Sequence, residues 1–379
     1  MNFEFTKEQE LVIQTAREFA ETELKPIAAE CDLKGTFPMD QYMQMSDMGL
    51  IGLPFSTQYG GAGGDYLSYI LAVEEISKVD ASVGISYSVQ TSLCMGAINT
   101  YGTEAQKQKY LSALCSQRKI GSFGLTEPNA GTDASGVQTV AVKDGDHYVL
   151  NGQKCFITNS PIADIFVIFA TIDRNLGTKG ITAFIVEKEY EGVSIGKIED
   201  KMGIRASQVG EIILKDCRVP AENMMGKEGR GFGIAMATLD GGRIGVAAQA
   251  LGIAEGAIDE TVKYMKERKQ FGKPIYKFQY LAFRMADLKA RVEQARYLVY
   301  KAAMDKQLGK PYAESAAIAK MVASDCAMYV TTHCVQMLGG YGFIKDYPVE
   351  RMMRDSKITQ IYEGTNEVQR MIISGAMFR

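Results

Sequence analysis

The sequence feature that most constrains the fold is a block of short, alternating β-type segments, residues 119–222, between two stretches with helical periodicity. The pairs Asp144-Gly145 and Asn151-Gly152 separate several of these segments and are strong hairpin signals. No helical pattern inside the block is long enough for the crossover that neighbouring parallel strands need. The block is therefore predicted to form an antiparallel β-barrel or β-sandwich.

Helical patterns flank this block on both sides. Residues 82–98 are small, apolar and nearly uncharged, which is typical of a helix buried on every face. Long apolar stripes with short connections, near 228–266, 280–307 and 313–338, predict an up-down helical bundle. The chain is thus predicted to be an α+β multidomain protein with an N-terminal helical domain at 1–118, a central β domain at 119–225 and a C-terminal bundle at 226–379.

The charge balance limits the possible partners. The 379 residues carry a net charge of −3 without any run of lysine and arginine, so neither nucleic acid nor an anionic membrane surface is an expected partner. No apolar run reaches the ~18 residues of a membrane span. The N-terminal residues resemble neither a signal peptide nor a transit sequence, and a cytoplasmic location is expected.

Few residues are available for metal or triad chemistry. The seven cysteines contain no C-x-x-C pair and are odd in number, which favours reduced thiols over a disulfide framework. Only His147 and His333 could supply an imidazole, so a zinc site or a Ser-His-Asp triad is poorly supported, and no metal is predicted. The glycines form neither a Rossmann fingerprint nor a Walker loop. The chemistry is therefore assigned to carboxylates and a bound cofactor.

The strongest candidate for a catalytic group is Glu363. It lies between an aromatic residue and a glycine, just before a short helix for which Asn366 and Gln369 form a possible capping box. Because it lies outside the helix, the backbone conformation of the turn sets the direction of its carboxylate. Burial beside apolar neighbours would raise the pKa of this carboxyl group, as a general base near neutral pH requires. The alternative is a solvated glutamate in a surface turn.

Residues 123–136 form a second candidate stretch, rich in glycine and small polar residues. Such a loop exposes many backbone N–H groups, which can bind a polar ring edge or a phosphate. Beside it, Phe156 offers a flat face and Thr158 a hydroxyl, so the two stretches together predict one wall of a cofactor site. The alternative is an ordinary connecting loop.

Adjacent glycines within a helical pattern mark a third stretch. Gly241 and Gly242 each cost about 1 kcal/mol relative to alanine in a helix, which makes sense where another group must approach the backbone closely. Arg243 beside them could hold a carboxylate or anchor a ligand; the alternative is a simple helix break. Residues 268–274 and 336–342 fit plain helix stops, or sites that bind pyrophosphate through Arg268 or exposed backbone amides.

Taken in order, six of these motifs resemble the flavin-dependent acyl-CoA dehydrogenase family over essentially the whole chain, and most closely its short-chain, butyryl-CoA-type members. The motifs lie at 124–133, 156–159, 239–243, 268–272, 336–342 and 361–365. The resemblance implies an N-terminal helical domain, a central β domain and a C-terminal four-helix bundle. It also implies a homotetramer, a dimer of dimers, that binds FAD non-covalently at a subunit interface.

The resemblance further assigns roles to individual residues. Glu363 would remove the α proton of an acyl-CoA, and the β hydrogen would leave as hydride to flavin N5. Electrons would then pass to electron-transferring flavoprotein. The residues expected to contact FAD are Phe123, Leu125, Thr126, Gly131, Thr132, Phe156, Ile157, Thr158, Arg268, Gln270, Phe271, Gln279, Gln336, Met337, Gly339, Gly340, Thr365 and Glu367. Those expected to contact the acyl-CoA are Thr132, Asp240, Gly241, Gly242, Arg243, Tyr362 and Gly364.

Several alternatives remain open at the level of sequence. Isobutyryl-CoA or 2-methylbutyryl-CoA could replace butyryl-CoA, and the reaction could run in reverse as a crotonyl-CoA reductase coupled to electron bifurcation. Glutaryl-CoA is disfavoured, because Gly84 stands where glutaryl-CoA dehydrogenases have an arginine. Two further hypotheses for the function are an oxidase on the same fold and a non-catalytic flavin-bearing binding protein. The acidic composition and the intact Glu363 argue against the binding protein.

Overall fold

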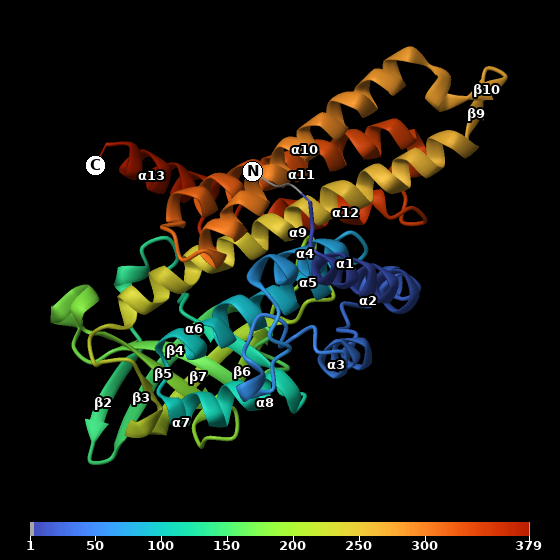
Figure 1. Ribbon diagram of the computed structural model, residues 1–379. Helices are drawn as coiled ribbons and strands as arrows, with labels where there is room; N and C mark the ends of the chain where they lie inside the picture. The colour runs from blue at the N-terminus through green and yellow to red at the C-terminus, as the bar shows by residue number, and fades with distance from the viewer. Residues whose placement is uncertain (1–3, 379) are drawn as a thin grey trace.

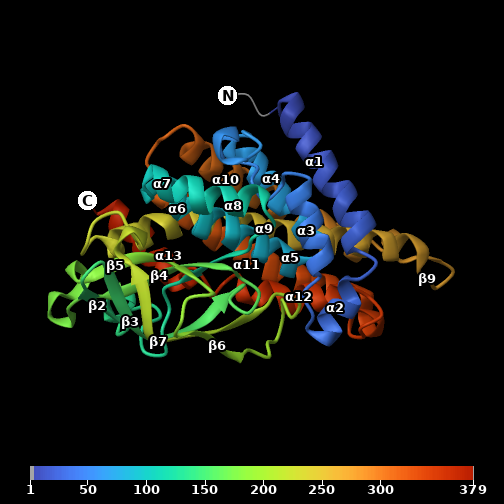
Figure 2. The same cartoon turned by 90° about the horizontal axis from the view of Figure 1, so that it is seen from below.

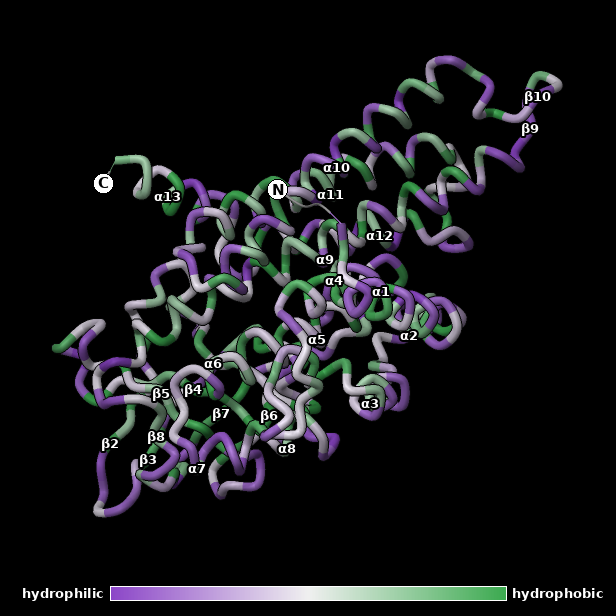
Figure 3. The backbone as a smooth tube through the Cα atoms, viewed as in Figure 1, coloured by the Kyte–Doolittle hydropathy of each residue, from purple (hydrophilic) through white to green (hydrophobic). Residues whose placement is uncertain are grey.

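The computed structural model describes residues 4–378 and has three parts: an N-terminal group of helices, a β-sheet and a bundle of long helices (Figure 1). Hydrophobic segments gather around α4, whereas the outer helix α1 is largely hydrophilic (Figure 3). The N-terminal helices are α1 (Lys7–Phe19), α2 (Ala28–Lys34), α3 (Met39–Asp47), α4 (Tyr66–Ser77), α5 (Ala81–Ser88), α6 (Gly96–Tyr101), α7 (Glu104–Gln106) and α8 (Ser112–Ser116).

The uncharged stretch predicted to be buried is buried. Every residue of α5 lies in the core, as does every residue of the π-helical segment Val89–Met95 that continues it. These residues lack a polar face, so they are stable only where other elements cover them on all sides. Helix α5 and this segment both pack against α9 of the bundle, and the segment also packs against the first strand of the sheet.

The β domain is one sheet in the strand order β6-β7-β3-β2-β4-β5-β8, with β1 added beside β4. Most strand pairs are antiparallel, as expected, but β1 runs parallel to β4, and β2 pairs with β4 in parallel at Val140 and Thr171; local hairpin signals cannot predict these pairings. The strands are β1 (Gly121–Gly124), β2 (Val140–Asp144), β3 (His147–Thr158), β4 (Ile165–Thr171), β5 (Ile181–Glu187), β6 (Val193–Ile198), β7 (Val209–Pro220) and β8 (Met224–Met225).

One of the two predicted hairpin turns is correct. Gly145 lies in the turn between β2 and β3, but Asn151-Gly152 lies inside β3, where its register with β7 shifts. A Cβ atom on Gly152 would lie 2.4 Å from the Thr139 hydroxyl oxygen. The prediction of a turn at Asn151-Gly152 is therefore wrong, because this glycine permits a close approach between chain segments.

The C-terminal part consists of long helices, close to the predicted segments. Helix α9 runs from beside the sheet to the small β9–β10 hairpin at the opposite end of the molecule, and Figure 2 shows the sheet and this hairpin well apart from a second direction. Within residues 4–378 no helix is long and apolar enough to cross a membrane. The elements are α9 (Gly231–Glu267), β9 (Lys269–Gln270), β10 (Lys273–Pro274), α10 (Gln279–Gln307), α11 (Ala313–Leu338), α12 (Val349–Ile358) and α13 (Asn366–Met377).

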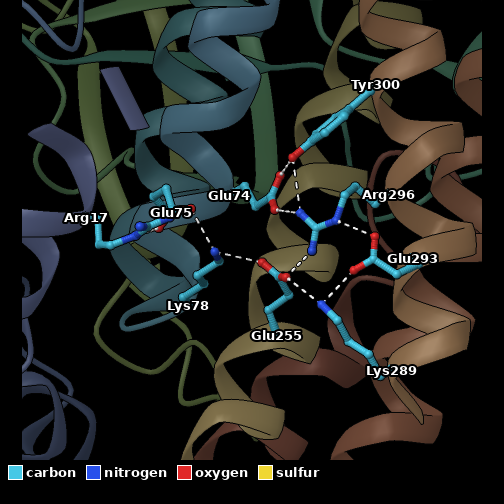
Figure 4. Close-up of polar contacts among 9 residues, drawn as sticks. All are labelled: Arg17, Glu74, Glu75, Lys78, Glu255, Lys289, Glu293, Arg296 and Tyr300. Atoms are coloured by element: carbon cyan, nitrogen blue, oxygen red, sulfur yellow. Dashed lines mark hydrogen bonds and ion pairs between the residues drawn. The ribbon is translucent and has the colours of Figure 1, made fainter. Parts of the chain in front are cut away.

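A network of buried charges joins the N-terminal helices to the bundle (Figure 4). Arg296 of α10 donates to Glu74 of α4 at 2.5 Å and also contacts Glu255 of α9. Lys78, at the end of α4, bridges Glu75 and Glu255, at 2.7 Å each. Because these carboxylates are largely removed from water, the cations that compensate them fix how the three helices dock.

We expect Arg296→Met to destabilise the protein by about 3–5 kcal/mol, since it leaves the buried carboxylates of Glu74 and Glu255 without their shared cation. The matched control is Lys289→Met. Lys289 contacts Glu255 and Glu293 but its side chain is 56% exposed, so its loss should change stability by less than about 1 kcal/mol. Thermal and guanidinium unfolding of both variants would check this, and equal destabilisation by the two would contradict it.

Candidate active site

The loop that carries Glu363 joins α12 to α13 and packs against the bundle. Glu363 has a φ of 53° and Gly364 a φ of 92°, so two successive residues adopt left-handed backbone conformations. A left-handed glutamate is uncommon and persists where surrounding contacts impose it. The direction of its side chain is therefore determined by the contacts of this loop with neighbouring helices.

The predicted capping box at the start of α13 is wrong. Thr365 caps the helix, with its hydroxyl accepting from the Val368 N–H at 3.4 Å, and Asn366 is the first helical residue. The Asn366 side chain is buried and donates to Ser324 and Asp325 of α11. The prediction failed because tertiary partners engage Asn366, while its neighbour has an equally suitable capping side chain.

Three side chains hold the carbonyl groups of the Glu363 loop. The Lys320 amine of α11 donates to the Gly364 carbonyl oxygen at 2.9 Å, and the Gln369 side-chain amide donates to the same carbonyl oxygen at 2.8 Å. Arg243 of α9 donates to the backbone carbonyl oxygen of Glu363 at 3.4 Å. No acceptor for the Glu363 backbone N–H is found among residues 4–378. The carbonyl groups are thus fixed on the bundle side, and this N–H remains available to a ligand.

The Glu363 carboxylate lacks hydrogen-bond partners among the described residues although both its oxygen atoms are buried. Burial raises the pKa of this carboxyl group to about 7, against the opposing effect of the positive charges on Arg243 and Lys320. A solvated glutamate in a surface turn is therefore excluded. The group combines the burial and the proton affinity of a general base that works near neutral pH.

Of the two adjacent glycines of α9, Gly242 makes room for this carboxylate, whereas Gly241 faces Lys306. A Cβ atom on Gly242 would lie 2.0 Å from a carboxylate oxygen of Glu363 and 2.6 Å from a methyl group of Leu93. The expectation that some group approaches the helix backbone closely here is confirmed, and that group is Glu363 itself. Alanine at position 242 could be accommodated only if the carboxylate moved.

Most of the residues predicted to contact acyl-CoA lie around Glu363. Arg243 is buried and forms an ion pair with Asp240, and Tyr66 of α4 donates to the Gly241 carbonyl at 3.1 Å. The Tyr362 hydroxyl donates to Gln249 of α9. Thr132 is the exception: it is an exposed residue of the β domain, and no described contact joins it to this group.

Sequence reasoning missed several residues of this site, above all Lys320. Tyr66, Leu93 and Gln249 were also missed, since nothing in their local patterns marks them. For Lys320 a signal did exist, because it is a single lysine among the small and apolar residues 316–323 of α11. A charged residue on a buried helix face usually has a specific partner.

A second cluster of predicted residues lies on β3. Phe156 has a φ of 57° at an irregularity between β3 and β7, and its side chain is 66% exposed. A bulge re-aims side chains in this way. Phe123, Leu125 and Ile157 are buried behind it, while Thr126 and Thr158 are partly exposed.

A buried ion pair secures the loop beside Phe156. Lys154 contacts Glu127 at 2.6 Å, and the same carboxylate accepts from the backbone N–H groups of Gln138 and Thr139. Burial lowers the pKa of Lys154 to about 8. The Cys155 N–H also donates to the Thr126 carbonyl at 3.0 Å. The loop and the exposed aromatic ring therefore form one rigid surface, which we call the β3 wall (residues 123–132 and 156–158).

The remaining predicted cofactor residues lie elsewhere. A groove of about 690 Å³ beside the β9–β10 hairpin contains seven of them: Arg268, Gln270, Phe271, Gln336, Met337, Gly339 and Gly340. Phe271 in this groove is 92% exposed. Gln279 begins α10 nearby, whereas Thr365 and Glu367 lie at the start of α13. We call this groove the hairpin groove; the sheet that carries the β3 wall and the β9–β10 hairpin beside the groove lie well apart (Figure 1).

The raised pKa of Glu363 has a consequence for stability. A carboxyl group whose pKa rises from 4.5 to about 7 on folding opposes folding once the pH exceeds 4.5, and its effect is complete above pH 7. We expect Glu363→Gln to increase the free energy of unfolding by up to about 3 kcal/mol above pH 7 and by little at pH 4.5. Thermal unfolding across this pH range would check it. The exposed Glu314→Gln is the control, and a pH-independent effect of Glu363→Gln would contradict the prediction.

Three domain models of one family match the chain almost end to end. Residues 6–118 match the acyl-CoA dehydrogenase N-terminal domain, residues 122–217 its middle domain and residues 229–378 its C-terminal domain. The chain is 63% identical to the short-chain specific acyl-CoA dehydrogenase of Clostridium acetobutylicum over 379 residues, covering 100% of both.

Solved structures agree with these matches. The structure of butyryl-CoA dehydrogenase from Megasphaera elsdenii is similar with a TM-score of 0.99 and 56% identity, covering 100% of both chains. A chain from a structure described as the electron transferring flavoprotein of Acidaminococcus fermentans has the same TM-score, identity and coverage. Given a buried glutamate against Gly242 and full-length similarity of this degree, the chain belongs to the acyl-CoA dehydrogenase family.

Proposed function

We propose that this protein catalyses the FAD-dependent α,β-dehydrogenation of a short-chain acyl-CoA, converting butyryl-CoA to crotonyl-CoA, with Glu363 as the base for the α proton. One observation carries the proposal: a buried carboxylate without a hydrogen-bond partner among the described residues, and with a pKa of about 7. The 63% identity to a short-chain specific relative supports the substrate class.

The backbone around Glu363 supports the same reaction. Removing an α proton places negative charge on the thioester carbonyl oxygen, and a fixed N–H donor stabilises such charge without reorganisation. The Glu363 N–H is available for this, because it has no acceptor among the described residues, and Arg243 and Lys320 hold the carbonyl groups of Glu363 and Gly364 in place. The base and a hydrogen-bond donor for the carbonyl therefore come from a single residue.

The described residues fit a bound flavin. The β3 wall offers an exposed aromatic ring and polar loop atoms, and the hairpin groove offers Arg268 and two exposed glycines, Gly339 and Gly340. When bound, FAD supplies the acceptor for the β hydride at N5. Thr126 and Thr158, both partly exposed, are suited to hydrogen-bond the edge of the ring.

The separation of the β3 wall from the hairpin groove supports an assembly of several subunits. We propose that the wall binds the flavin ring of one FAD, while the groove binds the pyrophosphate and adenosine of a neighbouring subunit's FAD, within a homotetramer. Exposed Phe271 and Phe343 near the groove fit a surface that another copy covers.

We further propose electron-transferring flavoprotein as the redox partner. The similarity to a chain from the Acidaminococcus fermentans structure supports this partner and keeps the reverse direction open. A cytoplasmic location is proposed as well, and the seven buried free cysteines fit a reducing compartment.

The structure around Gly84 argues against a dicarboxylate substrate. Gly84 is buried in α5, and a Cβ atom on it would lie 2.1 Å from the Ser77 hydroxyl oxygen. A side chain at this position would have to displace the Ser77 hydroxyl group, and glycine itself projects no cation from here towards a distal carboxylate. Glutaryl-CoA is accordingly not favoured.

Glu363→Gln should retain FAD but lower the rate of flavin reduction by butyryl-CoA by about 10²–10⁴-fold, because the amide cannot accept the α proton. Anaerobic stopped-flow absorbance of the flavin would measure the rate, and flavin content would be determined from the same sample. Glu314→Gln, on the exposed start of α11, is the control and should be reduced at the wild-type rate. Flavin reduction in Glu363→Gln as fast as in wild type would exclude Glu363 as the base.

The substrate class is tested with a panel of acyl-CoA esters. We expect butyryl-CoA to bleach the flavin of the wild-type protein faster than isobutyryl-CoA, glutaryl-CoA or octanoyl-CoA, measured anaerobically at equal concentrations. Faster bleaching by a branched or longer ester would keep the mechanism and overturn the substrate. Protein that takes up no FAD would overturn the function.

A further inference from the structure

Lys320 is a buried cation whose partners are unusual. Its side chain is 0% exposed, and its amine donates to the Gly364 carbonyl at 2.9 Å and to Asn366 Oδ1 at 3.0 Å. Both acceptors are neutral, and no described carboxylate lies within ion-pair distance. Burying an ammonium group without an anion in contact is unfavourable. A function that needs this charge would account for its presence.

We propose that Lys320 is a positioning residue for the reaction: it holds the Gly364 peptide so that the Glu363 carboxylate faces α9, and its charge tunes the proton affinity of that carboxylate. The inference deepens the proposed function, because it rests on Glu363 being the base. Lys320 itself need not touch substrate or flavin.

The hydrogen bonds around Lys320 explain the positioning. The left-handed backbone of Glu363 is unfavourable for a residue with a side chain and relaxes unless its neighbours restrain it. Lys320 and Gln369 both donate to the Gly364 carbonyl, which fixes the following peptide. Asn366, the second acceptor of Lys320, is itself anchored to Ser324 of α11. The loop is thereby attached to one face of α11.

The charges around Glu363 explain the tuning. Two cations face its carboxylate, Arg243 from α9 and Lys320 from α11, and both oppose the rise of its pKa on burial. Arg243 is also paired with Asp240, which offsets part of its charge. The other titratable groups facing Glu363 are the hydroxyls of Tyr66, Tyr69 and Tyr362, which burial keeps neutral by raising their pKa.

Lys320 carries its charge at neutral pH. Burial lowers the pKa of its amine to about 8, and the charged groups that act on it are Glu363, Arg243, Asp325 and Glu367. Lys320 is therefore mostly protonated in the range where Glu363 titrates. Loss of this cation should raise the pKa of Glu363 further and leave less ionised base at neutral pH.

The test compares Lys320→Gln, Lys320→Met and Lys320→Arg in the FAD-loaded protein. Glutamine retains hydrogen-bond donors but no charge, methionine removes both, and arginine restores the charge. We expect the apparent pKa for flavin reduction by butyryl-CoA to rise by about one unit in the glutamine variant. Its rate at pH 7 should fall about fivefold and approach wild type at high pH. The methionine variant should be slower at every pH, and the arginine variant should return the apparent pKa towards wild type.

Ser324→Ala is the matched control, since Ser324 lies one turn further along α11 and contacts the same asparagine without carrying a charge. Its apparent pKa should equal that of wild type. A shift as large as that of Lys320→Gln would mean that loop disturbance alone moves the profile, and would overturn the tuning role. An unchanged profile in both uncharged Lys320 variants would overturn it as well.

A second readout does not depend on turnover. The infrared band of the protonated Glu363 carboxyl group, with Glu363→Gln as the blank, reports its titration in wild type and in each Lys320 variant. If the band titrates at higher pH in Lys320→Gln while no acyl-CoA reduces the flavin of wild type, the effect of Lys320 on the Glu363 carboxyl group is established and the proposed reaction fails. If wild type is reduced but the band does not shift, the inference alone fails.

Discussion

The removal of one carboxylate from water is the constraint on which the rest of the site depends. Glu363 carries its charge into a region where no described residue donates a hydrogen bond to it, and burial holds its pKa near 7. Burying such a group lowers the stability of the fold, so the surrounding contacts must hold the carboxylate in place. Its contacts do so in two ways, since Gly242 of α9 leaves space for the carboxylate, and donors from α9, α11 and α13 hold the adjacent carbonyl groups.

The positions of these helices rest in turn on long-range interactions. The ion network around Arg296 links α4, α9 and α10. Its member on α9 is Glu255, which is on the same helix as Gly242 and Arg243. Small residues along α9 allow close packing; a Cβ atom on Gly252 would lie 2.3 Å from the Glu74 carbonyl oxygen. Fold stability and site geometry therefore share one structural element, and a shift of α9 would move the carboxylate's environment with it.

The residues proposed to bind the flavin cofactor form two separate groups. The β3 wall owes its rigidity to the Lys154–Glu127 ion pair inside the sheet, whereas the hairpin groove is formed by the ends of α9 and α11. Because these two surfaces lie well apart, the homotetramer proposed above would share each FAD between neighbouring copies. Binding of the cofactor and assembly of subunits would then stabilise each other through linkage.

Local signals in the sequence predicted the long helices of the bundle, the burial of α5, the turn at Gly145 and the close approach of another group to Gly242, because periodicity, turn chemistry and helix-unfavourable glycines depend on neighbouring residues. Tertiary contacts instead place Gly152 inside a strand, make Thr365 rather than Asn366 the cap of α13, and bring Lys320 to the Glu363 loop. Each of these depends on a partner that lies more than ten residues away along the chain. Burial and desolvation arise from such distant partners, and they set the proton affinity of Glu363.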